Sequence, residues 1–210
     1  MNIEYEFFYF GPLLWKTKLS NEIIDGLLER GLISNTSHRH KLVGHFKNEY
    51  SYTTDDMNWF VNKSMPYFLE HRKSAEHWYE TDMKPVQLTS LWINIMKAGD
   101  YNPPHTHDGE LSFVIYLKVP EKLKEEFDEY EGRSPTTNGA GAVTFVTTHV
   151  KTNNFINSKT FLPEVGDMYI FPAGLPHYVA PFKCEGERIS VSGNISARLS
   201  DMVYENITTK

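Results

Sequence analysis

The second half of this 210-residue chain is built from short runs of β-branched and aromatic residues separated by Gly, Pro and Asn turns. These runs are VQLTSLWINIMKAG, LSFVIYLKVP, AVTFVTTHV, DMYIFPAG, HYVAPF and RISVSGNIS, and most of them follow one another without a helix-length periodic segment. Parallel strands need a long crossover, usually a helix, whereas antiparallel strands need only a turn. The pattern therefore predicts a mainly β fold, an antiparallel barrel or sandwich over residues 86–200.

Residues 1–85 predict a helical N-terminal support region, so that residues 1–210 form a single domain with peripheral helices. The stretch LSNEIIDGLLERG has apolar residues at helical spacing, Ser20 or Asn21 as N-cap and Gly31 as a C-terminal stop. A second helix begins near Thr54. We expect Pro66 to kink or break it, and YFLEHRKSAEHWY to continue as another helix.

The stretch from Glu121 to Ala142 interrupts the strand pattern. It begins with the charged sequence EKLKEEFDEYEG and ends in a loop rich in Gly, Ser, Thr and Asn. Long segments between strands commonly carry lids or binding residues. We therefore expect an inserted mobile loop over residues 121–142, at the mouth of the barrel.

Composition argues against several classes of protein. The chain has 21 Lys and Arg against 27 Asp and Glu, a formal charge of −6, with no basic block, so we expect no nucleic-acid partner. The start MNIEYEFFYF has no basic signal-peptide region, and no apolar run reaches membrane-spanning length, so we expect no membrane association. The single cysteine, Cys184, cannot form an internal disulfide. We expect a cytoplasmic protein; composition does not set its oligomeric state.

Three histidines at strand boundaries are candidate metal ligands. His105 and His107 stand one residue apart, after a proline pair and before Gly109, and residues i and i+2 of an extended chain project to the same side. His177 follows the turn FPAGLP after another apolar strand. Imidazole binds iron, zinc, copper or nickel, and a pair of histidines needs a third ligand from elsewhere. Each histidine alone could be an ordinary surface or core residue, but the set predicts a metal site.

Arg188 and Ser190 begin the last predicted strand. The chain leaves His177 through YVA, turns through PFKCEGE and returns, which predicts a hairpin with Arg188 beside His177, displaced by roughly 7–12 Å. A guanidinium grips carboxylates through paired hydrogen bonds. A metal at one end and Arg188 at the other would hold a short dicarboxylate, with Ser190 facing the same way as a further donor.

Taken together, these residues resemble a known family. LWINIMKAGDYNPPHTHDGELSFVIYLKVP and GDMYIFPAGLPHYVAPF, followed by ERISVSGNI, are similar to the Fe(II)/2-oxoglutarate-dependent oxygenases of marine bacteria and their phages, relatives of the prolyl 4-hydroxylase-like group. The resemblance covers about Ser90 to Ser196, half of the chain. It implies a double-stranded β-helix, a jelly-roll or cupin-like barrel, that uses Fe(II), O2 and the cosubstrate 2-oxoglutarate, with ascorbate as a candidate reductant.

The activity that this resemblance implies is a dioxygenase reaction. Such an enzyme hydroxylates a prolyl or other protein residue, or a small molecule, and releases succinate and CO2. The compartment is then the host cytoplasm if the protein is phage-encoded. The resemblance does not identify the substrate.

The resemblance also implies residues for the cosubstrate. Arg188 and Ser190 match the R-x-S pair that holds the distal carboxylate of 2-oxoglutarate, and Tyr116 falls where members use a tyrosine hydroxyl on that carboxylate. Asn94, in a W-x-N sequence on the preceding strand, is expected to contact cosubstrate or substrate. Trp92 of the same sequence is expected to be a packing residue.

The metal ligands depart from the pattern at one position. His105 and His177 match the two iron-binding histidines, but His107 stands where the wider superfamily has the aspartate of H-x-D. We expect His107 to be the third ligand. Asp108, next to it, and Glu110, which could curl back after Gly109, are the alternatives.

Two other functions fit parts of the sequence. The spacings G-x5-H-x-H-x2-E from Gly99 and G-x5-P-x-G-x2-H from Gly166 are close to the two cupin motifs, in which Glu110 would be a fourth ligand. A cupin-type metal enzyme would act without 2-oxoglutarate and would not require Arg188. The other alternative is a non-catalytic barrel used as a binding module.

Overall fold

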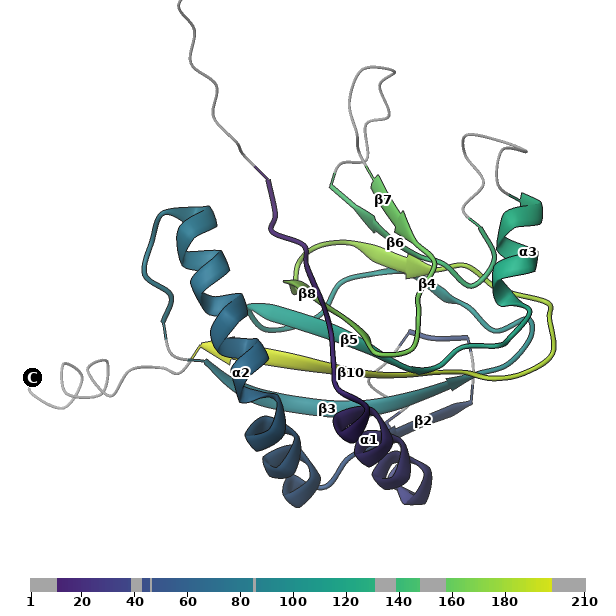
Figure 1. Ribbon diagram of the computed structural model, residues 1–210, viewed down its shortest axis with the longest axis horizontal. Coiled ribbons are helices and arrows are strands. Elements are labelled where there is room, and N and C mark those ends of the chain that lie inside the picture. The colour runs from purple at the N-terminus through teal and green to yellow at the C-terminus, as the bar shows by residue number, and fades with distance from the viewer. Residues whose placement is uncertain are drawn as a thin grey trace, which may run out of the picture.

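The structure is a computed structural model that describes residues 11–38, 43–45, 47–84, 86–130, 139–147 and 158–197. Within these ranges the strands form two antiparallel sheets that pack face to face, and α1 and α2 lie on the outer side of the larger one (Figure 1). The larger sheet has the order β1-β8-β5-β10-β3-β2 and the smaller one the order β4-β9-β6-β7.

The bounds of these elements are as follows. The helices are α1 (Asn21–Ile33), α2 (Thr54–Tyr79) and α3 (Leu123–Tyr130). The strands are β1 (Trp15–Lys18), β2 (Asn48–Ser51), β3 (Val86–Met96), β4 (Asn102–His105), β5 (Leu111–Lys118), β6 (Val143–Val146), β7 (Ser158–Phe161), β8 (Asp167–Pro172), β9 (His177–Val179) and β10 (Arg188–Ala197).

The last strand, β10, organises the larger sheet because it pairs with β3 on one side and with β5 on the other. Side chains of a strand alternate between its two faces. Ile189, Val191 and Ile195 therefore enter the core beneath the helices, whereas Arg188 and Ser190 point into the space between the sheets. One strand thus supplies both apolar packing and a polar interior wall.

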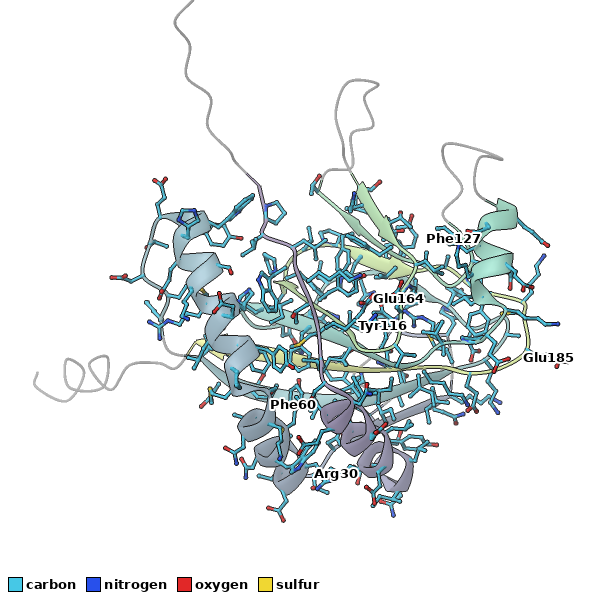
Figure 2. All side chains as sticks on the ribbon, in the orientation of Figure 1. Arg30, Phe60, Tyr116, Phe127, Glu164 and Glu185 are labelled. Atoms are coloured by element: carbon cyan, nitrogen blue, oxygen red, sulfur yellow. The ribbon has the colours of Figure 1, made fainter. Side chains whose placement is uncertain are left out.

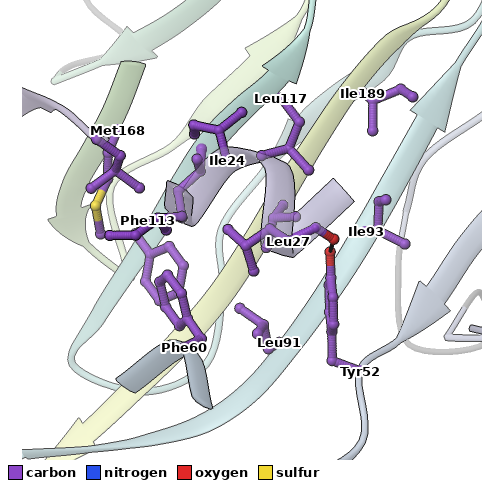
Figure 3. Packing of buried hydrophobic residues seen from close by; sticks show 14 of the residues in the cluster. Ile24, Leu27, Tyr52, Phe60, Leu91, Ile93, Phe113, Leu117, Met168 and Ile189 are labelled. Carbon is purple, nitrogen blue, oxygen red and sulfur yellow. Dashed lines mark hydrogen bonds between the residues drawn. The ribbon is translucent and has the colours of Figure 1, made fainter. Parts of the chain in front are cut away.

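The core between the helices and the larger sheet is aromatic and aliphatic (Figure 3). Leu27 of α1, Phe60 of α2 and Phe113 of β5 are fully buried there. Each such side chain contributes about 1.5–3 kcal/mol by leaving water. The hydroxyl of Tyr52 donates a 2.7 Å hydrogen bond to the carbonyl oxygen of Leu27, which is a dashed line in Figure 3. This core holds the larger sheet rigid from its outer side.

A second core lies between the two sheets. Phe145 of the smaller sheet contacts Phe171 of the larger one, with ring centroids 4.9 Å apart, and also lies 6.0 Å from the ring of Tyr169. Leu123 of α3 is buried in the same cluster. These contacts fix the separation of the sheets, and with it the width of the space between them.

The six predicted strands of the second half are confirmed, while four predictions about the inserted loop and the first half need revision. The segment 121–142 contains the helix α3 rather than only a loop, and its residues 131–138 lie outside the described residues. The first half also contributes β1 and β2, which are hydrogen-bonded into the larger sheet. Residues 1–85 are therefore not purely helical.

Both helices of the first half run further than predicted. The helix α1 continues through Gly31 to Ile33, because the chain leaves the helix through an extended Ser34 rather than through a left-handed glycine. Helix α2 is continuous across Pro66, so the separate second helix is wrong. Burial on both sides of the proline, by Phe60 before it and His71 after it, compensates for the backbone hydrogen bond that proline cannot donate.

The edge strand β4 was not predicted because its sequence, NPPH, contains two prolines. Proline lacks an N–H and is confined to sheet edges, and β4 is indeed at one edge of the smaller sheet. None of the helices in the described part of the chain is long and apolar enough to cross a membrane.

Gly193 in β10 is predicted to be essential for packing. A Cβ at this position would collide with the ring of Phe113 and lie 2.8 Å from the carbonyl oxygen of Ser90. We expect Gly193→Ala to lower the free energy of unfolding by about 1–3 kcal/mol, as overpacked core substitutions do, measured by urea denaturation. Gly174→Ala is the control, since no atom lies within 4 Å of its Cβ. Equal stability of the two variants would contradict this account of the core.

Candidate active site

The three predicted histidines come together between the sheets. His105 and His177 are directly opposite each other on the paired strands β4 and β9, and their ring centroids are 4.3 Å apart. His107 lies two residues beyond His105, and its Nε2 is 3.2 Å from Nε2 of His177. One ring nitrogen from each of the three lies within 4.8 Å of the others. The three histidines converge as expected, but the pairing of β4 with β9 that brings His105 and His177 together was not predicted.

Two of these rings are oriented by backbone carbonyl groups. Nδ1 of His105 is 2.7 Å from the oxygen of Pro103, and Nδ1 of His177 is 3.0 Å from the oxygen of Leu175. A carbonyl only accepts, so each Nδ1 must carry the proton, which leaves the lone pair of each Nε2 facing the cluster. Such hydrogen bonds are the usual way in which metal-binding histidines are fixed.

The cluster favours neutral imidazoles. Burial lowers the pKa of His177 to about 3, with the nearby His105 as a second cause, and burial lowers the pKa of His107 to about 4. Burial also lowers the pKa of His105. A coordinating nitrogen must be unprotonated, and a neutral imidazole has one such nitrogen to offer at neutral pH.

Asp108 and Glu110, the alternatives for the third ligand, are exposed and do not belong to the histidine cluster. The turn after His107 explains their position. Gly109 has φ +96°, a left-handed conformation that L side chains rarely adopt, and the next residue donates its N–H to the carbonyl oxygen of Ile195. The chain therefore leaves the site directly after His107.

Arg188 is buried in the inner wall formed by the larger sheet. It is 1% exposed, and its Nη2 donates a 3.1 Å hydrogen bond to the hydroxyl of Tyr116 while the guanidinium lies 4.8 Å from the centre of that ring. Its Nη1 contacts Sδ of Met96 at 3.2 Å, and its Nε has no hydrogen-bond partner among the described residues. Figure 2 shows Tyr116 deep inside the molecule. A buried cation with an unused donor is suited to bind an anion.

The other predicted cosubstrate residues lie on the same wall. Ser190 pairs with Asn94 of β3 on one side and with Tyr116 of β5 on the other, so the three form one row across the sheet. Asn94 donates a 3.2 Å hydrogen bond to the hydroxyl of Ser192, two residues beyond Ser190 on β10. All of these side chains, with Arg188, line one cavity together with the three histidines.

The predicted hairpin between His177 and Arg188 is wrong. The strand β9 pairs with β4 and β6, and β10 pairs with β3 and β5, so the chain crosses from the smaller sheet to the larger one between them. Arg188 consequently faces the histidines across the cavity instead of lying beside His177 on a neighbouring strand. The cavity has a volume of about 70 Å³, room for a small ligand rather than a single water molecule.

Sequence reasoning missed two contributors to the site. Glu49 of β2 is 1% exposed and lines the cavity, but β2 itself was not predicted. Trp92 was expected only to pack, and it does so at 2% exposure, yet its ring also lies 5.7 Å from that of His107. Trp92 is two residues before Asn94 on β3, so both side chains project to the same face of the sheet. This spacing could have placed Trp92 at the site.

The residues present fit a metal ion and an anionic ligand. Two nitrogens that each lie about 2.1 Å from one metal ion, with an N–metal–N angle of about 90°, are about 3 Å apart. This is close to the 3.2 Å between Nε2 of His107 and Nε2 of His177. Imidazole nitrogens suit iron, and the unpaired Nε of Arg188 suits a carboxylate.

Known structures share this architecture. The viral collagen prolyl hydroxylase of Paramecium bursaria Chlorella virus-1, in complex with 2OG, is 18% identical with a TM-score of 0.56, over 88% of this chain and 96% of that one. A prolyl-4-hydroxylase from Pseudomonas putida is 13% identical, covers 88% and 92%, and has a TM-score of 0.53. HygX from Streptomyces hygroscopicus, with nickel, 2-oxoglutarate and hygromycin B bound, is 9% identical, covers 90% and 84%, and has a TM-score of 0.57. The fold is therefore the double-stranded β-helix of these oxygenases.

Sequence comparison extends this likeness from fold to family. Among curated proteins, none matches the sequence. The family described as "Putative 2OG-Fe(II) oxygenase" matches residues 90–194, half of the chain, and this segment includes all three histidines and Arg188. The chain belongs to the 2OG-Fe(II) oxygenase family and is an enzyme of that kind.

Proposed function

We propose that the protein is a hydroxylase that couples oxidation of a substrate C–H bond to conversion of 2-oxoglutarate and O2 into succinate and CO2. The observation that carries this proposal is the convergence, in one cavity, of three neutral histidines with a buried guanidinium. A cupin-type enzyme would need the histidines but not Arg188, and a binding module would need neither.

In this proposal His105, His107 and His177 hold Fe(II), which supplies the oxygen chemistry when bound. Their neutrality leaves both charges of the metal uncompensated by protein ligands. The two carboxylates of 2-oxoglutarate would provide the balancing charge, so cosubstrate and metal should bind more tightly together than separately.

The cosubstrate is held by the opposite wall. Arg188 and Tyr116 bind its distal carboxylate, Ser190 adds a hydroxyl, and Asn94 orients cosubstrate or substrate. The aromatic core between the sheets excludes water from this end of the cavity. The protein thus contributes orientation and a dry site.

The substrate is proposed by class only. The prolyl hydroxylases among the similar structures make a prolyl residue in a peptide the first class to test, and HygX, with hygromycin B bound, makes a small molecule the second. The single free Cys184 is consistent with action in a reducing cytoplasm.

Loss of either cross-strand histidine should remove the metal site. We expect His105→Ala and His177→Ala each to weaken Fe(II) or Co(II) binding more than about 100-fold, because changes to residues that only orient ligands already cost 10–100-fold. Binding is measured by anaerobic titration, and His77→Ala, an exposed histidine on α2, is the control. Stoichiometric metal binding by the two site variants would contradict the assignment.

Replacing Arg188 tests whether 2-oxoglutarate is the cosubstrate. Removing hydrogen bonds to a charged group costs about 1.5–3 kcal/mol, so we expect Arg188→Met to weaken 2-oxoglutarate binding about 10- to 150-fold. The measurement is the visible charge-transfer band of the anaerobic Fe(II) protein titrated with 2-oxoglutarate. Retained Co(II) binding shows that the variant folds, and exposed Arg72→Met is the control. Unchanged 2-oxoglutarate binding would favour the cupin-type alternative.

An assay of turnover tests both the proposed reaction and the class of substrate. Succinate release is followed in air, with ascorbate present and absent, while proline-containing peptides and small molecules are added in turn. We expect the correct class to raise succinate release and to yield one hydroxylated product per succinate. Folded, iron-loaded protein that never forms succinate would contradict the proposed function.

A further inference from the structure

The three histidines of the metal site are not held in the same way. His105 and His177 are each fixed by a hydrogen bond from Nδ1 to the carbonyl oxygen two residues earlier. In the described part of the chain, Nδ1 of His107 has no such bond, and the ring's polar contact is the 3.2 Å approach to His177. Among the described residues, ring contacts are therefore the interactions that can orient His107.

The indole of Trp92 is the group in the right place. It projects from β3 into the space between the sheets, is 2% exposed, and lies with its centroid 5.7 Å from that of His107 at an interplanar angle of 50°. Tilted aromatic pairs at 4.5–7 Å contribute about 0.5–1.5 kcal/mol beyond area burial, comparable to a hydrogen bond.

Trp92 also contacts a second imidazole. The ring of His38 stacks on it, with centroids 5.2 Å apart and planes 15° from parallel. Nδ1 of His38 lies 2.7 Å from the hydroxyl of Ser51, and its backbone N–H donates to the carbonyl oxygen of Glu49, so β2 holds the imidazole. Trp92 therefore contacts both a fixed His38 and the ring of His107.

We propose that Trp92 is the positioning residue of the third metal ligand: the His38–Trp92 stack holds the His107 ring against the metal site, the task that a backbone carbonyl performs for the other two histidines. This inference rests on the proposed function, since it takes His107 as a ligand. It gives Trp92 a role beyond packing. It also implies that changes in β2, which holds His38, affect the orientation of His107 more than that of the other two histidines.

A double-substitution cycle tests the proposal with Co(II) as the probe. Co(II) affinity and the visible spectrum of the bound ion are measured for the unsubstituted protein, Trp92→Leu, His107→Ala and the double variant. We expect Trp92→Leu to weaken binding about 2- to 13-fold, the size of one aromatic contact, and to shift the spectrum towards that of His107→Ala. In the His107→Ala background the same substitution should change nothing further.

Two variants guard against a purely structural explanation. Trp92→Phe keeps an aromatic face and should restore most of the affinity, and Trp59→Leu removes a tryptophan that packs against Arg30 and should leave Co(II) binding unchanged. Thermal unfolding of each variant confirms that it folds.

The role of Trp92 would be overturned if Trp92→Leu lowered Co(II) affinity equally in the unsubstituted protein and in His107→Ala. Unchanged Co(II) affinity in folded Trp92→Leu would overturn it as well. Failure of the unsubstituted protein to bind Co(II) would instead overturn the metal site of the proposed function. The two failures are therefore distinguishable.

Discussion

The register of β10 between β3 and β5 is the constraint on which the site depends. Because side chains alternate along a strand, this register points Arg188 and Ser190 inward while Ile189 and Val191 enter the core beneath the helices. A slip of one residue would exchange the two faces and bury a guanidinium among aliphatic side chains. Burial of the apolar face of β10 therefore determines that its polar side chains point into the cavity.

The histidine cluster and the buried guanidinium of the cavity come from different sheets. The strands β4 and β9 of the smaller sheet carry two of the histidines, and β10 of the larger sheet carries the guanidinium. Their separation is set by contacts such as that of Phe145 with Phe171, which join the sheets next to His177. Apolar packing beside His177 thus sets the width of the cavity in which the proposed dicarboxylate would bind.

Much of this arrangement could be predicted from local patterns. Alternating apolar runs identified the strands of the barrel, and the i, i+2 spacing of His105 and His107 correctly placed them together. The partner strands could not be predicted, because turn residues do not specify whether a chain returns to the same sheet. The segment between His177 and Arg188 reads as a hairpin, yet it crosses between sheets.

Other misses have specific physical causes. Pro66 signals a helix break, but tertiary burial on both sides keeps α2 continuous. The short strand β2, with the sequence NEYS, has no alternating pattern strong enough to be recognised. Without β2, neither the cavity-lining Glu49 nor the support of Trp92 through His38 could be inferred.

The two prolines of β4 have a consequence beyond the geometry of His105. An exposed sheet edge normally offers a row of N–H groups to which another extended chain can add. Pro103 and Pro104 are adjacent and have no N–H, and since successive N–H groups of a strand point to opposite sides, one of the two prolines removes an outward-facing donor at this edge, beside the histidines. A polypeptide that approaches this edge therefore finds a short strand with a missing donor, which is a poor template for regular strand addition.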